Sequence, residues 1–193
     1  NSLRGLLYEF GVVLRGGRQA GLKALAEQRA AIDEQLPEAM RLLVNGQLRS
    51  LEQINERVDE LERELAALQC QMDKAVQLRK VPGIGVLGAT ALAATLGDGA
   101  AWRSGREFSA SIGLVPAHSG TGGKARMGRI SKRGDPYLRT LLIHGARAAL
   151  PSLAKGRTLL GEWLRGLLAR THMNTAVVAL AALINVSRLL KRD

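Results

Sequence analysis

The segment from Ser119 to Arg139 combines glycines, hydroxyls and cations that together can do chemistry on phosphate. It reads Ser-Gly-Thr-Gly-Gly-Lys-Ala-Arg-Met-Gly-Arg-Ile-Ser-Lys-Arg-Gly-Asp-Pro-Tyr-Leu-Arg. Its cations, set against the single acid Asp135, are Lys124, Arg126, Arg129, Lys132, Arg133 and Arg139. Glycines such as Gly122 and Gly123 let a backbone approach a bulky anion, and Lys and Arg neutralise its charge. We therefore expect the segment to bind nucleic-acid phosphates.

The hydroxyls of Ser119 and Thr121 lie at the N-terminal end of this cationic segment. A serine oxygen can attack a phosphodiester and form a phosphoserine ester, which divides strand exchange into two transesterifications of similar energy. The step requires cations around the non-bridging oxygens, and Lys124, Arg126 and Arg129 would supply them. Composition alone leaves two readings open: a surface that only holds phosphate, or a nucleophile that attacks it.

The sequence lacks the residues for two other kinds of phosphate chemistry, metal-dependent cleavage and P-loop nucleotide binding. The three histidines, His118, His144 and His172, are far apart in the sequence, and few carboxylates follow Asp98. A two-metal nuclease site needs several convergent carboxylates, so we expect no metal and no cofactor in this chain. A nucleotide-binding P-loop is also excluded, because Lys124 is followed by Ala125 rather than Ser or Thr.

Composition points to a polyanionic partner. The 193 residues include 28 Lys and Arg against 17 Asp and Glu, a formal charge of +11, which favours nucleic acid. Aromatic residues make up only 3% of the chain, so base stacking on aromatic platforms is not the expected main mode of binding. No apolar run of about 18 residues is present, so no membrane partner is expected. A bacterial cytoplasmic, nucleoid-associated protein fits these features.

The pattern of apolar residues predicts a mainly α fold. Helices are expected over residues 1–14 and 19–35, followed by one long helix from Glu38 to Arg79. An a/d seam runs along the long helix through Leu51, Ile54, Val58, Leu61, Leu65, Leu68, Met72 and Ala75. The seam either forms a coiled coil between subunits or folds back on an earlier helix. We favour a homo-oligomer, dimer or tetramer, because the heptads persist longer than a globular helix needs.

The second half begins with a break at Val81-Pro-Gly-Ile-Gly85, followed by a helix from Val86 to Leu96. This pattern is typical of a helix-hairpin-helix element, in which Gly83 and Gly85 would present backbone amides to a phosphate. The alternative is a plain break between two helices.

Further helices are expected from capping signals. Ser104 and Glu107 form a capping box for a helix through Ile112, and Asp135-Pro136 starts one over Tyr137–Leu150. Helices over Leu159–Arg170 and Thr175–Leu190 complete the chain. Residues 116–134 are predicted to be a Gly-rich loop, and no strand is predicted anywhere.

A series of motifs in the second half closely resembles one family. The runs are Val81-Pro-Gly-Ile-Gly, Phe108-Ser-Ala-Ser-Ile-Gly-Leu-Val-Pro116, Ser119-Gly-Thr-Gly-Gly-Lys124, Gly128-Arg-Ile-Ser-Lys-Arg-Gly134 and Tyr137-Leu-Arg-Thr-Leu-Leu-Ile-His-Gly-Ala-Arg147. In this order they resemble the C-terminal part of the Piv/MooV-like insertion-sequence transposases, the one-ten and eleven-eleven insertion-sequence group.

The resemblance implies recombination of DNA through a serine nucleophile, guided by a structured RNA. It also implies an N-terminal RuvC-like domain with four acidic residues that bind Mg²⁺. This sequence would begin after that domain, so isolated activity is expected to be low or nil. The implied division is a helical and coiled-coil region over 1–80 and a transposase domain over 81–193.

The motif departs from the family at the expected nucleophile. Many relatives carry Ser-Ser or Ser-Thr directly before Gly-Gly-Lys, whereas this chain has Gly120-Thr121, with Ser119 one position earlier. We prefer Ser119 to Thr121 as the nucleophile, because a primary hydroxyl is less hindered and Gly120 adds conformational freedom. Ser131 is expected to be structural or to bind phosphate.

Overall fold

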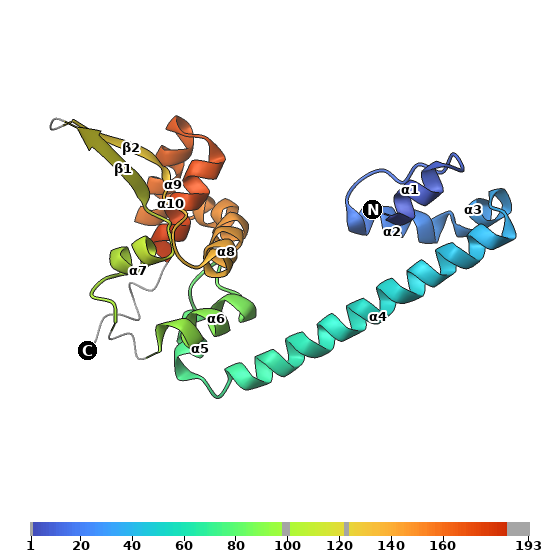
Figure 1. The fold of residues 1–193 in the computed structure, drawn as a ribbon, viewed down its shortest axis with the longest axis horizontal. Coiled ribbons are helices and arrows are strands. Elements are labelled where there is room, and N and C mark those ends of the chain that lie inside the picture. The colour runs from blue at the N-terminus through green and yellow to red at the C-terminus, as the bar shows by residue number, and fades with distance from the viewer. Residues whose placement is uncertain (1, 98–100, 122–123, 185–193) are drawn as a thin grey trace. The chain divides into compact units, whose positions relative to one another are not determined.

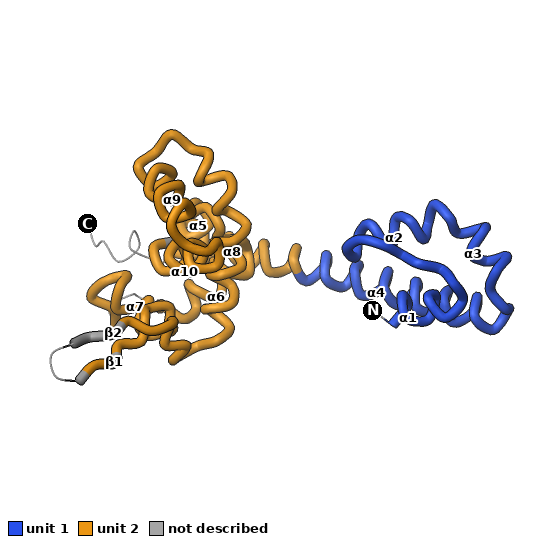
Figure 2. The backbone as a smooth tube through the Cα atoms, turned by 90° about the horizontal axis from the view of Figure 1, so that it is seen from above, with its two compact units in different colours: residues 1–61 blue, residues 62–193 orange. Residues whose placement is uncertain are grey.

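The computed structural model describes residues 2–97, 101–121 and 124–184, with the backbone alone at 119, 121, 124–126 and 184. These ranges form ten helices and one two-stranded sheet (Figure 1), which confirms the mainly α class. The chain divides into two compact units, Asn1–Leu61 and Glu62–Asp193 (Figure 2). The boundary between these units lies inside the longest helix.

The first unit contains α1 (Ser2–Tyr8), α2 (Arg18–Glu27), α3 (Arg29–Gln35) and the N-terminal part of α4 (Glu38–Gln69). Its small core consists of Leu3, Leu7, Val12, Leu25, Ile32, Leu36 and Val44. The helix predicted over residues 1–14 ends early, because Gly11 adopts a φ of 77° just after α1. The helix predicted over 19–35 is divided at Gln28 into α2 and α3.

The long helix ends ten residues before Arg79, where it was predicted to end, so that part of the prediction was wrong. Gln69 is only 2% exposed, and its side-chain amide donates to Val86 O and to Thr90 Oγ1, each at 3.1 Å. A buried amide needs such partners. A turn follows Gln69, and the chain resumes as the short helix α5 (Asp73–Leu78).

The apolar seam of α4 is largely uncovered within this chain. Ile54, Val58, Leu61 and Leu68 are 58%, 46%, 46% and 58% exposed. Met40, Val44 and Leu48, which precede the seam on α4, pack on the core of the first unit.

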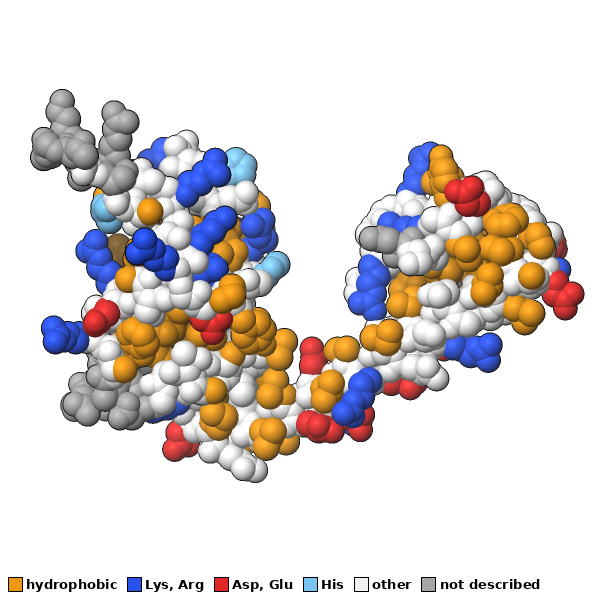
Figure 3. Space-filling model, in the orientation of Figure 1, with side chains coloured by type: hydrophobic (Ala, Val, Ile, Leu, Met, Phe, Trp, Pro, Cys, Tyr) orange, Lys and Arg blue, Asp and Glu red, His pale blue; other side chains and the backbone are white. Residues whose placement is uncertain are grey.

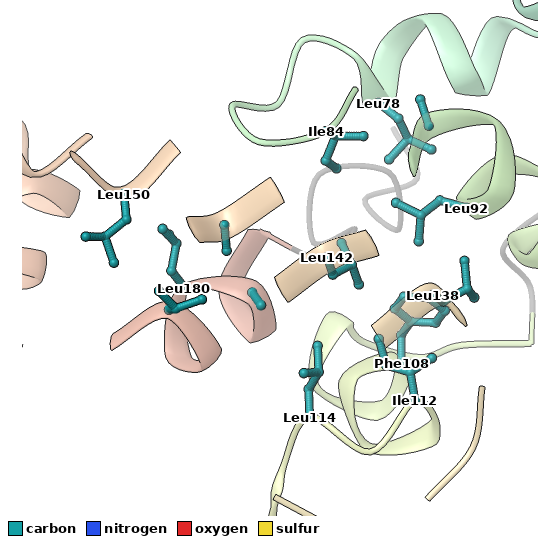
Figure 4. Packing of buried hydrophobic residues seen from close by; sticks show 14 of the residues in the cluster. Leu78, Ile84, Leu92, Phe108, Ile112, Leu114, Leu138, Leu142, Leu150 and Leu180 are labelled. Atoms are coloured by element: carbon teal, nitrogen blue, oxygen red, sulfur yellow. The ribbon is translucent and has the colours of Figure 1, made fainter. Parts of the chain in front are cut away.

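The second unit is built around α8 (Pro136–Lys155), which packs against α6 (Val86–Leu96), α9 (Leu159–Arg170) and α10 (Met173–Ile184). Leu138 and Leu142 of α8 lie among buried side chains from α5, α6, α7 (Gly105–Ser111) and α10 (Figure 4). The predicted starts of α7 and α8 are confirmed. The Ser104 hydroxyl accepts from the Glu107 amide at 3.2 Å, and Asp135 accepts from the amides of Tyr137 and Leu138.

At the C-terminus, α9 matches its predicted bounds, and α10 begins two residues before the predicted Thr175. Val177, Leu180 and Ala181 are buried in the core of the second unit. The predicted continuation to Leu190 lies outside the described residues.

The prediction that no strand is present was wrong. Residues 116–134 begin as an antiparallel hairpin, β1 (Pro116–Thr121) and β2 (Lys124–Ile130), rather than an irregular loop. The pair Thr121↔Lys124 leaves only Gly122 and Gly123 between the strands, and Gly-Gly between two runs is a hairpin signal. That signal was present in the sequence. The usual alternation of apolar and polar residues was missing.

Candidate nucleic-acid interface on a basic hairpin

The root of the hairpin is fastened to the end of α7 by two glycines at positive φ. Gly113 has a φ of 72° and Gly134 one of 82°. A Cβ on Gly113 would lie 2.3 Å from the Arg133 carbonyl oxygen, and one on Gly134 would lie 1.7 Å from that of Ser111. No other residue fits so close an approach. The entry and exit of the hairpin are therefore fixed backbone to backbone.

Hydrogen bonds reinforce this root. The Ser131 amide donates to Val115 O at 2.9 Å, and the Lys132 amide donates to Gly113 O at 3.1 Å. Lys132 is the one non-glycine with positive φ among the described residues, at 55°, a conformation that costs energy unless its surroundings hold it. Ser131 and Lys132 thus help to anchor the hairpin through their backbone.

Arg139 joins the two sides of the root from the start of α8. Its Nη1 donates to Ile112 O at 2.9 Å and lies 3.4 Å from Arg133 O. The guanidinium thereby contacts the segment before β1 and the segment after β2. Arg139 was predicted to bind nucleic acid; the structure gives it a structural contact, and its binding role stays a prediction.

The ladder of the hairpin brings the two candidate nucleophiles opposite two of the predicted cations. Ser119 pairs with Arg126, and Thr121 pairs with Lys124. Residues directly opposite in an antiparallel pair have Cβ atoms about 4.5–5.5 Å apart, and positions two apart share a face. Positions 119, 121, 124 and 126 therefore belong to one face of the ribbon. Gly122 and Gly123 lie outside the described residues.

A β-bulge separates this regular ladder from the root. Pro116 pairs with Ile130 but His118 pairs with Met127, so Gly128 and Arg129 together oppose Ala117. Bulges bend the strand that carries them and redirect its side chains. Arg129 therefore lies at a point where the alternation along β2 is interrupted.

The loop before α6 lies apart from the hairpin and packs on α8. Gly83 has a φ of 90°, and its added Cβ would lie 2.7 Å from Gly145 O; a Cβ on Gly145 would lie 1.8 Å from Gly83 O. Gly83 is therefore needed for packing. Gly85 is the N-cap of α6, where the first N–H groups of a helix have no intrahelical acceptor. The predicted phosphate contacts of Gly83 and Gly85 stay a prediction.

The remaining candidate groups do not converge. His118 and His144 are exposed, and His172 Nδ1 accepts from the Asn174 amide at 3.1 Å. In the described ranges, no three His, Cys, Asp or Glu side chains come together as a metal site would require. Among the same residues, no helix is both long and apolar enough to cross a membrane.

Sequence reasoning missed the supporting glycines Gly113 and Gly145. Gly113 was visible within Ile-Gly-Leu-Val-Pro, but a single glycine after a helix is read as a helix end. Its second role, contact with Arg133, depends on residues twenty positions later in the chain.

Comparison with known proteins finds similarity to transposases. Residues 75–160 match the family described as Transposase IS116/IS110/IS902 family. This match begins in α5 and runs through the hairpin and α8 to the start of α9.

Whole-chain relatives carry the same kind of name. The chain is 44% identical over 94% of its length to a "Probable family 20 transposase" of Pseudomonas aeruginosa. It is 38% and 36% identical, again over 94%, to the transposases for insertion sequence elements IS1328 of Yersinia enterocolitica and IS1111A of Coxiella burnetii. The chain spans about half the length of these relatives: 54%, 53% and 50%.

Proposed function

We propose that this chain, which resembles the IS116/IS110/IS902 transposases, supplies the nucleophile with which a DNA transposase cuts and rejoins strands. The observation that carries the proposal is the register of the hairpin. It pairs Ser119 with Arg126 and Thr121 with Lys124. The backbone positions of a serine and two basic residues thus lie close together on a short ribbon, and these residue types suit attack on a phosphodiester.

The chemistry proposed is a pair of transesterifications. The Ser119 oxygen gives up its proton and attacks phosphorus; the new Oγ–P bond replaces one P–O bond to a sugar, whose oxygen leaves as a hydroxyl. A sugar hydroxyl of a second strand then attacks the phosphoserine and restores the serine. Lys124, Arg126 and Arg129 would hold the non-bridging oxygens as charge shifts. The number of phosphodiester bonds is conserved, so no energy source is needed.

The remaining cations and the glycines would hold the strand in place. We assign phosphate contacts to Lys132, Arg133 and Arg139 near the root of the hairpin and to the amides near Gly83 and Gly85. Such contacts carry no sequence information. A guide RNA that pairs with donor and target DNA would supply specificity, and a RuvC-like domain with Mg²⁺ would complete the activity. Both follow from the motif resemblance alone.

We further propose that the chain works as an oligomer through α4. The exposed side chains of Ile54, Val58 and Leu61 follow heptad spacing, and a second α4 would cover them. Recombination joins two DNA partners, so an assembly with more than one nucleophile suits it. Both dimers and tetramers satisfy this condition.

The experiment that tests the function is a covalent-adduct assay. The full-length protein that carries this chain is incubated with its guide RNA and labelled DNA, then denatured and resolved by gel electrophoresis. We expect a DNA-bound protein band with wild type and with Thr121→Ala, and none with Ser119→Ala. If Thr121→Ala removes the band and Ser119→Ala keeps it, the nucleophile is Thr121.

The same assay separates the main alternative, a non-catalytic module that binds nucleic acid and oligomerises. The exposed seam of α4 and the cationic hairpin are also the features that this alternative requires. It predicts salt-dependent binding with no covalent band under any condition.

A further inference from the structure

A cleft of about 1640 Å³ opens in the second unit between α7, the root of the hairpin and α10. Its apolar lining includes Leu114, Val178, Ala179 and Ala182. The buried Ser109 hydroxyl links the two helices at the base of the cleft. It lies 2.9 Å from Gly105 O and 3.0 Å from Ala182 O, and can donate to either. The floor is therefore formed by helices that are joined by a hydrogen bond.

Cations surround the cleft without opposing acids. Arg106, Arg129 and Lys132 line it, and no Asp or Glu is found among the described residues that do. Lys and Arg side chains gather on the visible face of the second unit below the hairpin (Figure 3). Asn174 and Thr175 add an amide and a hydroxyl at the α10 side. The lining thus suits a ligand with an apolar body, a few polar groups and a negative charge.

We infer that this cleft receives an unpaired base of the nucleic-acid strand held by the hairpin. A nucleotide has the required combination: a phosphate for the cations and a base whose face is apolar and whose edge can bond to Asn174 or Thr175. The cleft is larger than the roughly 300–1,000 Å³ of a typical small-molecule pocket. More than one base therefore fits.

The position of the cleft favours a nucleotide over a protein helix. His118 and Met127 pair across the hairpin and both line the cleft, and His118 directly precedes Ser119 in the chain. A strand whose phosphate reaches Ser119 therefore has a neighbouring base beside the cleft. The inference rests on the proposed function, because it takes the phosphate of the bound strand to lie at Ser119. It adds that bases next to the attacked phosphate are unstacked and held by aliphatic side chains.

The test measures the contribution of the base without any chemistry. Binding of this chain to a single-stranded DNA oligonucleotide is compared with binding to the same oligonucleotide carrying one abasic site, placed at each position in turn. For wild type we expect about tenfold weaker binding at one or two abasic positions, because the apolar surface that the base buries in the cleft is then lost. Ala179→Leu adds a larger apolar side chain to the lining of the cleft and should lower that ratio by displacing the base beside α10. Its dependence on salt should stay unchanged, since no cation is altered.

Ala91→Leu is the matched control. Ala91 lies on α6, is partly buried against the same core as Ala179, and does not line the cleft. The Ala91→Leu protein should keep the tenfold ratio between its affinities for the intact and the abasic oligonucleotide. Thermal unfolding of both variants checks that each is folded. A second measurement needs no variant: an oligonucleotide with 5-iododeoxyuridine at the sensitive position should photo-cross-link in wild type to His118 or Met127, which line the cleft.

Three results would overturn the inference. One is equal affinity for the intact and abasic oligonucleotides at every position. Another is an Ala179→Leu protein that is folded and keeps the full ratio. A third is a change in oligomeric mass on Ala179→Leu with the base ratio intact, which would make the cleft a protein interface. The abasic-site experiment measures binding and no covalent step. A failed adduct assay therefore does not change its outcome, and a failed abasic-site experiment does not change the outcome of the adduct assay.

Discussion

Gly145 shows how a single residue supports the site from a distance. It lies on α8, and the Gly83 carbonyl oxygen occupies the space in which its Cβ would lie, at 1.8 Å. The contact joins the loop before α6 to the helix that also carries Arg139. The loop and the hairpin root are therefore held by the same rigid element.

Gly145→Ala should destabilise the second unit by about 1–3 kcal/mol, because an added methyl group must push the loop away from α8. Gly88→Ala is the control: it is also a helical glycine, but its Cβ would make only an ordinary contact, 3.6 Å from Ile84. Alanine is the better helix former, so Gly88→Ala should be neutral or stabilising by up to about 1 kcal/mol. Chemical denaturation of both variants measures the difference. Equal stabilities would show that the loop yields without cost.

Arg139 acts on the hairpin from α8, and its removal should loosen the root. In Arg139→Met, the Ile112 and Arg133 carbonyls no longer have their guanidinium donor. The cost is about 1.5 kcal/mol, the low end for a charged hydrogen bond, because the side chain is only half-buried. Hydrogen exchange should quicken at the Ser131 and Lys132 amides, which are bonded to Val115 and Gly113.

Arg147→Met provides the comparison for Arg139. Arg147 is an exposed arginine of the same helix and donates to Asn174 at 3.1 Å. Exchange at Ser131 and Lys132 should stay at the wild-type rate in this variant. If hydrogen exchange at the Ser131 and Lys132 amides is unchanged in Arg139→Met, Arg139 does not stabilise the hairpin root, and only its proposed contact with nucleic acid remains.

Among elements, the helices with a cap or a buried stripe could be predicted from sequence, and the hairpin could not. Asp135-Pro136 and Ser104 through Glu107 set helix starts through their own hydrogen bonds, so local chemistry sufficed. The two strands pair only with each other, and their sequence lacks alternating apolar and polar residues. Only the Gly122-Gly123 pair indicated a hairpin. The end of α4 depends on Gln69 reaching Val86 and Thr90. Such contacts are set by tertiary packing.

The candidate site was predictable in composition but not in arrangement. The cations and hydroxyls are visible in the sequence. Their pairing across the ladder, Ser119 with Arg126 and Thr121 with Lys124, depends on the register. The cleft joins residues of α7 and α10 that lie about seventy positions apart in the chain, and no local pattern announces it.

The exposed seam of α4 makes a prediction at the scale of one helix. Val58→Asp should dissociate the proposed oligomer, because it places a charge at the centre of the apolar interface. Glu56→Gln alters a nearby exposed position off the seam and should leave the assembly intact. Sedimentation velocity measures both. A monomeric wild-type chain at micromolar concentration would contradict the coiled coil.

At the scale of the whole molecule, the charge of +11 predicts binding that weakens steeply with salt. If the hairpin region carries that binding, the triple substitution Arg129→Gln, Lys132→Gln and Arg133→Gln should lower the salt slope by about 2–3. Each phosphate that the variant no longer neutralises accounts for roughly 0.7–0.9 of that change. Binding isotherms over a series of salt concentrations measure this slope.

A second triple variant separates location from net charge. Lys23→Gln, Arg41→Gln and Arg49→Gln remove the same charge from the first unit, where all three side chains are exposed. The slope should then change by less than about one unit. Equal effects of the two triple variants would mean that overall charge, and not the hairpin, governs binding.

The central claim is that Ser119 attacks DNA, and mapping the attachment site tests it most directly. The covalent adduct is digested with nuclease and trypsin, and the peptide Glu107–Lys124 is fragmented in a mass spectrometer. We predict that the mass of the residual nucleotide lies on Ser119. A nucleotide on Thr121, or on a residue outside this peptide, would contradict the account.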